Sequence, residues 1–349
     1  MPPYTACSLM MPRLQRWIES IWYGARPAPI VLRWLAWLFG RLAVRRRQRL
    51  QASAERLSVP VIIIGNISVG GTGKTPLIAA LVEQLRDRGL RPGLISRGYG
   101  GRARHWPQPV QADSDPAQLG DEPVMLAQRL NCPIWVGPDR VAAARALLAN
   151  SPVDVLLSDD GLQHYRLGRD MELAVVDGVR GLGNGQLLPA GPLREPAERL
   201  AEVDLVVCNT ALIETAARSE ICMHLLLQDA VNLLSGERRP LAEFRADTVH
   251  AVAGIGHPER FFGRLESAGL SLQRHAFADH HAFTEADLAF VDELPVLMTD
   301  KDAVKCRPFA DERCWRVPVD AVFDAQDSKL IHLLIDDCLQ GHPAWTRSS

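Results

Sequence analysis

The sequence predicts an α/β protein with two domains: a P-loop domain whose parallel sheet lies between layers of helices (α/β/α), and a second, smaller α/β/α domain. Short apolar runs alternate with helical stretches from Val59 onward, a glycine-rich loop follows the first run, and another strand–turn–helix unit begins at His250. Such alternation produces a parallel sheet with helices on both faces. The 349 residues are enough for a core in each domain.

The larger domain, residues 57–215, is expected to consist of short apolar strands and periodic helices. Apolar runs of four to six residues are typical of buried strands, and a helix ends where glycine permits a left-handed cap, as at Gly89. The strands are expected at residues 59–64, 93–96, 133–136, 153–157, 173–176 and 205–208, and the helices at residues 75–88, 121–130 and 140–150.

The smaller domain is expected at residues 216–349. Its boundary with the larger domain can be placed only within residues 210–225, because no low-complexity linker precedes it. The strand from His250 leads through Gly254-Ile-Gly256 into a helix. This turn lacks the full G-x-G-x-x-G pattern, so we interpret it as a tight connection and not as a second nucleotide site. The remaining elements are expected at residues 258–268 and 330–339 (helices), and 296–298 and 316–319 (strands).

A glycine-rich loop separates the first strand of the larger domain from its first helix. In such a loop, backbone N–H groups and a helix N-terminus face an anion. The Lys74 ammonium is expected at the β- and γ-phosphates of a nucleoside triphosphate, and the Thr75 hydroxyl on Mg²⁺. The candidate nucleotide-binding residues are Ser68, Val69, Gly70, Gly71, Thr72, Gly73, Lys74 and Thr75.

This loop departs from G-x-x-x-x-G-K-[ST] at its first position, where the chain has Ser68. Serine is tolerated there if the backbone does not need a positive φ. The alternative interpretation is a glycine-rich turn that binds nothing. The strand before the loop and the stripe of Leu77, Leu81 and Leu85 after it favour a nucleotide site.

Asp159 and Asp160 end an apolar strand about 85 residues after Lys74. P-loop enzymes use a carboxylate at such a place to hold Mg²⁺, directly or through water. Both residues are therefore candidate metal ligands, and which of them contacts the ion stays open. A helix cap or a solvated turn is the alternative interpretation.

Phosphoryl transfer also needs a group that receives the proton of the attacking hydroxyl, and cations that stabilise negative charge. Candidate bases are Asp121 and the two histidines His280 and His281, since a carboxylate and an imidazole can form a poised pair. Taken alone, each of these residues is more often a surface charge. The candidate cations are Arg97, Arg102 and Arg194.

The N-terminal region, residues 1–56, is basic and rich in tryptophan. It carries ten arginines against Glu19 and Glu55, a net charge of +8, and half of the tryptophans of the chain. Its apolar run at residues 28–40 is shorter than the ~20 residues that span a bilayer.

Three interpretations of this N-terminal region compete. A secretory signal is disfavoured, because the apolar run begins too far into the chain and no cleavage site follows. A helix buried on the domain is the second. The third, which the tryptophans and arginines favour, is an interfacial helix on an anionic membrane surface, on its cytoplasmic side. The first ten residues look unlike the rest, so Met11 is an alternative to Met1 as the start.

The overall composition excludes several classes of protein. A net charge of −2 argues against wholesale nucleic-acid binding. The seven cysteines form no C-x-x-C pair, so neither a zinc cluster nor a disulfide framework is indicated, and a reducing compartment is the simpler interpretation.

Seven motifs occur in order along the chain: GNISVGGTGKTP (65–76), SRGYGG (96–101), GDEP (120–123), DDGLQH (159–164), LPAGPLREP (188–196), FADHHAFT (277–284) and TDKDAVK (299–305). Together they resemble the tetraacyldisaccharide 4′-kinase family, the lipid A 4′-kinases of Gram-negative bacteria. The fourth and fifth are much more specific than any P-loop. Ser68 matches the loop of this family, whereas Leu162 stands where an aromatic residue is expected.

The resemblance implies a fold, a reaction and a location. The fold is two α/β/α domains with the active site in the cleft between them. The reaction is transfer of the ATP γ-phosphate, with Mg²⁺, to the 4′-hydroxyl of a tetraacylated glucosamine disaccharide 1-phosphate, which gives lipid IVA. The location is the cytoplasmic face of the inner membrane, and no obligate protein partner and no nucleic acid are implied.

The resemblance also implies roles for individual residues. Lys74 and Thr75 take the phosphate and metal roles, and Asp159 and Asp160 resemble the metal carboxylates. Asp121 resembles the catalytic base, paired with His280, which we prefer to His281. The expected phosphate or substrate residues are Arg97, Arg194 and Glu195.

Two other classes of function remain as alternatives. One is a P-loop switch protein that regulates a membrane partner, but no partner-dependent loop with a glutamine or arginine finger is recognisable. The other is a soluble P-loop synthetase or kinase whose basic N-terminus binds nucleic acid. Its basic residues are confined to the N-terminal region beside an apolar helix, which disfavours this alternative.

Overall fold

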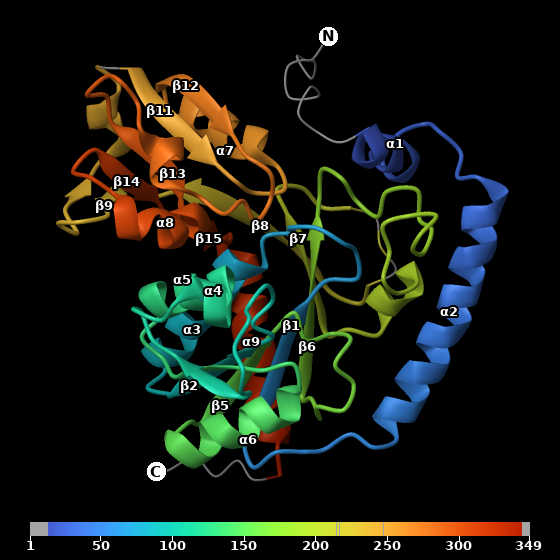
Figure 1. The fold of residues 1–349 in the computed structure, drawn as a ribbon. Helices are drawn as coiled ribbons and strands as arrows, with labels where there is room; N and C mark the ends of the chain where they lie inside the picture. Colours follow the sequence, from blue (N-terminus) through green and yellow to red (C-terminus); the bar gives the residue numbers. More distant parts are fainter. Residues whose placement is uncertain (1–12, 214, 216, 247, 344–349) are drawn as a thin grey trace.

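The structure is a computed structural model that describes residues 13–213, 215, 217–246 and 248–343. The alternative starts at Met1 and Met11 lie outside the described residues. Within these residues the chain forms a larger and a smaller sheet, each with helices on both faces (Figure 1). The predicted α/β class is confirmed.

The larger sheet is parallel from β8 to β4, with the antiparallel strands β15 and β3 at its two edges. The central strand β1 pairs Ile64 with Asp159 on one side and with Leu173 on the other. The loop after β1 and the turn after β5 therefore leave the sheet at the same carboxyl edge. In spatial order the strands are β15 (Val319–Val322), β8 (Glu220–Leu227), β7 (Leu205–Asn209), β6 (Met171–Asp177), β1 (Val61–Gly65), β5 (Val155–Asp159), β2 (Pro92–Ser96), β4 (Ile134–Val136) and β3 (Gln108–Val110).

Both faces of this sheet are buried, which is why its central strands are continuous apolar runs and do not alternate. One face packs against α3 (Lys74–Asp87), α5 (Asp121–Arg129) and α9 (Ala325–Gly341). The opposite face packs against α6 (Arg140–Asn150). The short α4 (Pro116–Leu119) precedes α5 directly.

The smaller sheet lies between α7 (Pro258–Ser267) on one face and α8 (Asp300–Cys306) on the other. It is parallel from β12 to β14 and ends in two antiparallel strands. In spatial order its strands are β10 (Arg238–Arg239), β9 (Ala230–Asn232), β14 (Cys314–Val317), β13 (Val296–Thr299), β11 (Thr248–Ala253) and β12 (Ser271–Ala276). Short 3₁₀ helices occur at η2 (Ala197–Ala201), η3 (Leu241–Phe244), η4 (Glu285–Leu288) and η5 (Arg307–Phe309).

The division into sheets differs from the expected boundary at residue 215. The strands β8 and β15 both belong to the larger sheet and are the two crossings between the domains. The last helix, α9, then buries Ile331 and Ile335 in the same core as Leu77 of α3. The apolar stripe of residues 330–339 shows that this helix is covered, but it carries no information about which sheet covers it.

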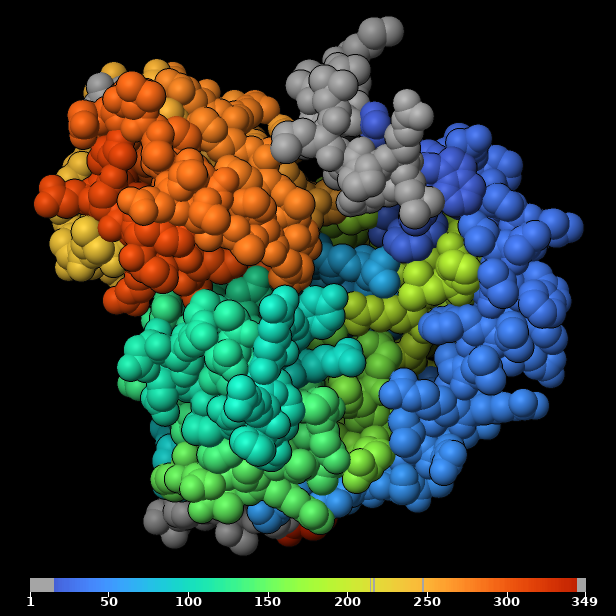
Figure 2. Space-filling model, in the orientation of Figure 1, coloured from blue at the N-terminus to red at the C-terminus, as the bar shows by residue number. Residues whose placement is uncertain are grey.

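The N-terminal helices α1 (Arg13–Trp22) and α2 (Ile30–Gln51) lie along the edge of the larger domain (Figures 1 and 2). Ala36 of α2 is buried, and Gly40 permits a close approach, because a Cβ there would lie 2.7 Å from Leu187 Cδ1. Among the helices that the structure describes, none combines the length and apolarity required for a membrane span.

Because α9 packs in the core of the larger domain, a substitution in this C-terminal helix should change the stability of that domain. Replacing the fully buried Ile335 by alanine leaves a cavity in that domain's core and should lower the free energy of unfolding by about 2–5 kcal/mol. Leu333→Ala, on the exposed side of the same helix, is the matched control and should change it by less than about 0.5 kcal/mol. Equal shifts of the denaturation midpoint for both variants would contradict the packing of α9 in this core.

Candidate active site

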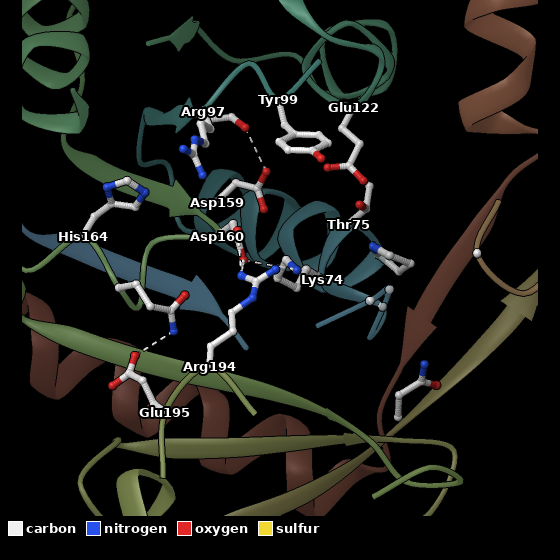
Figure 3. A pocket seen from close by; sticks show the side chains of 18 of the residues that line it. Lys74, Thr75, Arg97, Tyr99, Glu122, Asp159, Asp160, His164, Arg194 and Glu195 are labelled. Atoms are coloured by element: carbon white, nitrogen blue, oxygen red, sulfur yellow. Dashed lines mark hydrogen bonds and ion pairs between the residues drawn. The ribbon is translucent and has the colours of Figure 1, made fainter. Parts of the chain in front are cut away.

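A cavity of about 1330 Å³ lies at the carboxyl edge of the larger sheet, between the two domains. Its walls come from the loop at Gly70–Thr75, the turn after β5, one side of α2 and the segment of the smaller domain around His280. Figure 3 shows the polar side chains that converge on it. The Gly254–Gly256 turn contributes Gly256 to this same cavity.

The glycine-rich loop is a left-handed turn that opens α3. Gly70 and Gly73 have φ of +102° and +95°, whereas Ser68 is not among the residues with positive φ. Serine is therefore accommodated at the first position without strain. Gly73 is needed on two grounds, since a Cβ there would also lie 2.9 Å from Asn209 Nδ2.

Asp160 is the carboxylate at which the basic side chains of the cavity meet. Lys74 Nζ lies 3.4 Å from its Oδ1, and Arg194 Nη1 lies 3.1 Å from its Oδ2 (Figure 3). Burial alone would raise the pKa of Asp160, but Lys74 and Arg194 outweigh it and lower that pKa to about 2. Asp160 is thus ionised and holds the Lys74 side chain at the N-terminus of α3.

Asp159 is more buried than Asp160, and its neighbours offset less of the cost of burying its charge. Its Oδ2 accepts a hydrogen bond of 2.9 Å from the Ser96 hydroxyl, and its backbone carbonyl accepts one of 3.1 Å from the buried Arg140. Burial and the neighbouring charge of Asp160 raise the pKa of Asp159 despite the attraction of Lys74. Burial and the charge of Asp159 likewise raise the pKa of Glu122, which lines the same cavity.

The side-chain oxygens at this end of the cavity are suited to bind a divalent cation. Thr75, Asp159 and Asp160 supply hard oxygen ligands, and a cation would relieve the desolvation of Asp159. The described residues include no cluster of three or more histidine, cysteine or acidic side chains that could hold a metal.

A second acidic centre bridges the domains. Asp121, the first residue of α5, is buried, and its Oδ2 lies 3.1 Å from Nδ1 of His280 in the smaller domain. Asp121 Oδ1 accepts from the backbone N–H of Glu122 at 2.9 Å. His280 lines the cavity and has a left-handed backbone with φ +59°, while Asp121 lies behind it.

The chain matches the family model for tetraacyldisaccharide-1-P 4′-kinase over residues 28–339. It belongs to this family. A tetraacyldisaccharide 4′-kinase of Nitrosococcus oceani is 54% identical over 322 residues, covering 90% of this chain and 94% of that protein. The corresponding protein of Pseudomonas fluorescens is 50% identical and covers 92% of this chain and 97% of its own.

The fold comparison agrees with the family. A crystal structure of LpxK from Aquifex aeolicus, described as an "apo" form in complex with ATP, has a TM-score of 0.74 and 25% sequence identity. It covers 86% of this chain and 97% of that one. The resemblance on which the sequence-based predictions relied is thus confirmed at the level of family and fold.

The structure distinguishes between the two candidate histidines, His280 and His281, by the contacts that each makes. His280 faces Asp121, whereas His281 Nε2 lies 3.2 Å from Asp287 of η4 and does not line the cavity. Among the candidate cations, Arg97 and Arg194 line the cavity and Arg102 does not.

Glu195 lines the cavity but is held by its neighbours. Gln163 Nε2 donates to its Oε1 at 2.7 Å, and the Tyr165 hydroxyl donates to its Oε2. The same Gln163 amide also donates to the carbonyl of Asn66, whose own Oδ1 accepts from Lys74 at 3.3 Å. In this geometry Glu195 positions the lysine of the loop through that chain of contacts.

Three residues of the cavity wall were absent from the sequence-based set of candidates. Glu122 and His164 lie inside quoted motifs, GDEP and DDGLQH, and Lys301 lies inside TDKDAVK. Their membership in those motifs was the available signal. What the motifs did not indicate is that Lys301 of the smaller domain comes within 3.8 Å of Asp121.

The half-buried His164 predicts a pH dependence of stability. Burial and the charges of Arg140 and Arg97 lower its pKa from 6.5 to about 3. The unfolded chain therefore binds the extra proton first, and the free energy of unfolding falls as pH drops from about 6.5 toward 3. His164→Gln should flatten this fall by up to about 1.4 kcal/mol per pH unit. Urea titrations from pH 7.5 to 4.5 check it, and parallel curves for variant and wild type would contradict the burial of a neutral His164.

Proposed function

We propose that this cavity transfers the γ-phosphate of ATP to the 4′-hydroxyl of tetraacyldisaccharide 1-phosphate and so forms lipid IVA, a step of lipid A biosynthesis. Family membership supplies the reaction, since the relatives carry this activity in their names. The observation that carries its location is that the phosphate-binding loop and His280, the hydrogen-bond partner of Asp121, line one cavity.

The donor half of the reaction belongs to the larger domain. Backbone N–H groups of the loop and the N-terminus of α3 face the site of the phosphates, and Lys74 is aligned there by Asn66 and Asp160. Arg194 and Arg97 add cations for the charge that spreads over the transferred group. The crystal structure of the Aquifex aeolicus protein in complex with ATP supports ATP as the nucleotide.

Mg²⁺, when bound, would neutralise negative charge on the phosphates. Thr75 and the two carboxylates at the end of β5 are the residues that would hold it. Asp159 is the better candidate for direct contact with the ion, because the Asp160 carboxylate already forms ion pairs with Lys74 and Arg194. In this arrangement Asp160 orients the lysine while Asp159 faces the ion.

The acceptor half of the reaction belongs to the Asp121–His280 pair. The O–H bond of the sugar 4′-hydroxyl breaks, its proton passes to the Asp121 carboxylate, and its oxygen forms the new bond to phosphorus as ADP leaves. His280 holds that carboxylate by a hydrogen bond from the other domain. A base whose geometry is completed across two domains acts only when they are closed, which keeps water from the γ-phosphate.

A second contact holds the domains in the same arrangement. Asp177, at the carboxyl end of β6, is buried, and its Oδ1 accepts a hydrogen bond of 3.0 Å from Arg260 of α7. Burial would raise the pKa of Asp177, but Arg260 lowers it, so the carboxylate is ionised. This ion pair and the Asp121–His280 pair both reach the same cavity, because Arg260 and His280 line it.

The helix α2 supplies a surface for a membrane-bound substrate. Its exposed arginines flank the apolar side chains, and Arg41 lies 4.9 Å from the ring of Trp37. Exposed tryptophans with basic neighbours are typical of a helix in the headgroup region of an anionic membrane. The exposed apolar residues are Ile30, Val31, Trp34, Leu35, Trp37, Leu38, Leu42 and Val44.

The same helix also forms part of the wall of the cavity. Phe39, Leu42 and Arg46 line it, so the surface that meets lipid continues into the site. Arg47 fixes the helix by an ion pair with Glu202 and by its position over the ring of Tyr165. These contacts support work at the cytoplasmic face of the inner membrane, where ATP and the lipid headgroup are both within reach.

Removing the proposed base tests the reaction. Purified enzyme with γ-labelled ATP, Mg²⁺ and detergent-dispersed disaccharide 1-phosphate should place label in the lipid. Asp121→Ala should slow this transfer by about 100-fold or more, because general-base catalysis contributes about 10²–10⁴-fold. ATP affinity should stay within about threefold, since Asp121 does not line the nucleotide loop. Wild-type turnover by Asp121→Ala would remove this residue as the base.

The two adjacent histidines provide the control for that experiment. His280→Ala should lower transfer, whereas His281→Ala, which loses only a contact with Asp287, should keep it near the wild-type rate. Absence of label in the lipid, with ATP hydrolysis stimulated by a protein or a nucleic acid, would contradict the proposed activity as a whole.

Membrane docking through α2 predicts a separate effect. The double variant Trp34→Ser/Trp37→Ser should bind anionic vesicles at least about tenfold more weakly, because each buried aromatic ring contributes about 1.5–3 kcal/mol. Val291→Ser/Leu333→Ser removes two exposed apolar side chains elsewhere and is the control. Sedimentation with phosphatidylglycerol-containing vesicles measures both, and equal partitioning of the two variants would contradict the interfacial role of α2.

A further inference from the structure

Lys301 is the residue of the site that the proposed reaction leaves without a role. It is the second residue of α8, and only 14% of its side chain is exposed. Its ammonium lies at the junction of the two domains. Nζ is 3.1 Å from Asp279 Oδ1, 3.4 Å from His280 Nε2, 3.8 Å from Asp121 Oδ2 and 3.9 Å from Glu122 Oε1.

The lysine carries its proton in this environment. Burial alone would lower the pKa of Lys301, but the charges of Asp121, Glu122 and Asp279 outweigh it and raise that pKa. An ammonium has three donors and no acceptor. Any ring nitrogen that faces it must therefore present a lone pair.

That requirement fixes the proton of His280. The nitrogen that faces Lys301 is Nε2, so a neutral ring carries its proton on Nδ1, which lies 3.1 Å from Asp121 Oδ2 and donates to it. A doubly protonated ring would point an N–H at the ammonium and be repelled. The contacts of one lysine thus determine the tautomer of His280.

The other groups around the His280 ring indicate how the ring would be protonated without Lys301. The Tyr99 ring lies 5.5 Å from the ring of His280 and leaves its nitrogens free. Asp279 Oδ1 lies 3.9 Å from Nε2, on the side where Lys301 stands. Without the ammonium, Asp121 and Asp279 would face the two ring nitrogens, and two carboxylates favour the imidazolium.

We propose that Lys301 is a positioning residue: it covers Nε2 of His280, holds the ring neutral with its proton on Nδ1, and so leaves the Asp121 carboxylate as the proton acceptor of the pair. Only the kinetic consequence rests on the proposed base role of Asp121. A ring that became doubly protonated would share its charge with Asp121 and make that carboxylate a weaker base.

The ring nitrogens of His280 provide the direct test. Lys301→Met removes the charge and keeps most of the side-chain length. In full-length enzyme labelled with ¹⁵N-histidine, with the resonances assigned through their loss in His280→Gln, the wild type should show one protonated and one unprotonated nitrogen at pH 7. Lys301→Met should show two protonated nitrogens at pH 7 and regain the neutral pattern only at higher pH.

Kinetics adds a second readout. Lys301→Met should lower kcat about 10- to 100-fold, part of the 10²–10⁴-fold that a general base supplies, and leave the KM for ATP within about twofold. The acidic limb of its pH–rate profile should move to higher pH, because the imidazolium must lose its proton first. Lys301→Arg keeps the charge and should recover the neutral tautomer and most of kcat.

The control is Lys305→Met, on the same helix. Lys305 pairs with the buried Asp302 at 2.9 Å and does not face His280, so its loss should lower the Tm and leave the His280 resonances as in the wild type. Wild-type resonances in Lys301→Met, or the same change in both lysine variants, would overturn the proposal. A shift to the imidazolium with kcat retained would support the positioning of His280 and count against Asp121 as the base.

Discussion

The carboxyl edge of the larger sheet concentrates buried charge, and the rest of the site depends on how that charge is balanced. Parallel pairing of β1 with β5 places the loop before Lys74 beside the two carboxylates that follow β5. Lys74 and Arg194 neutralise Asp160, while Asp159 stays desolvated beside it. A polyanion with a divalent cation would complete this balance, so this edge of the sheet is suited to the donor of a phosphoryl group.

The elements and motifs of the larger domain could be predicted because their signals are local. A strand such as β1 is a continuous apolar run, and the glycines of the loop are required by the left-handed backbone at Gly70 and Gly73. Ser68 stands where no positive φ is needed, so the apparent departure from the pattern costs nothing. Local rules therefore gave the strand, the loop and the helix of the nucleotide site.

Other features depend on contacts between distant segments, which no local pattern contains. The stripe of α9 shows an apolar face but not that Ile335 lies in the core of the first domain. The sequence predicted Glu195 at phosphate or substrate, and it gave no sign of the contacts of its carboxylate with Gln163 and Tyr165. The sequence placed Asp121 and His280 in motifs 159 residues apart, and only the closed arrangement of the domains shows them in contact.

The division of the site between two domains has a chemical consequence. The larger domain alone presents the phosphate-binding loop and the carboxylates of β5, which is enough to bind a nucleotide. The hydrogen bond to Asp121 and the cation that faces it come from His280 and Lys301 of the smaller domain. Under the proposed function, the nucleotide site and the base Asp121 lie in the larger domain, and the residues that contact this base lie in the smaller one. Under the proposed function, this division between the domains would limit hydrolysis of ATP in the absence of the lipid acceptor.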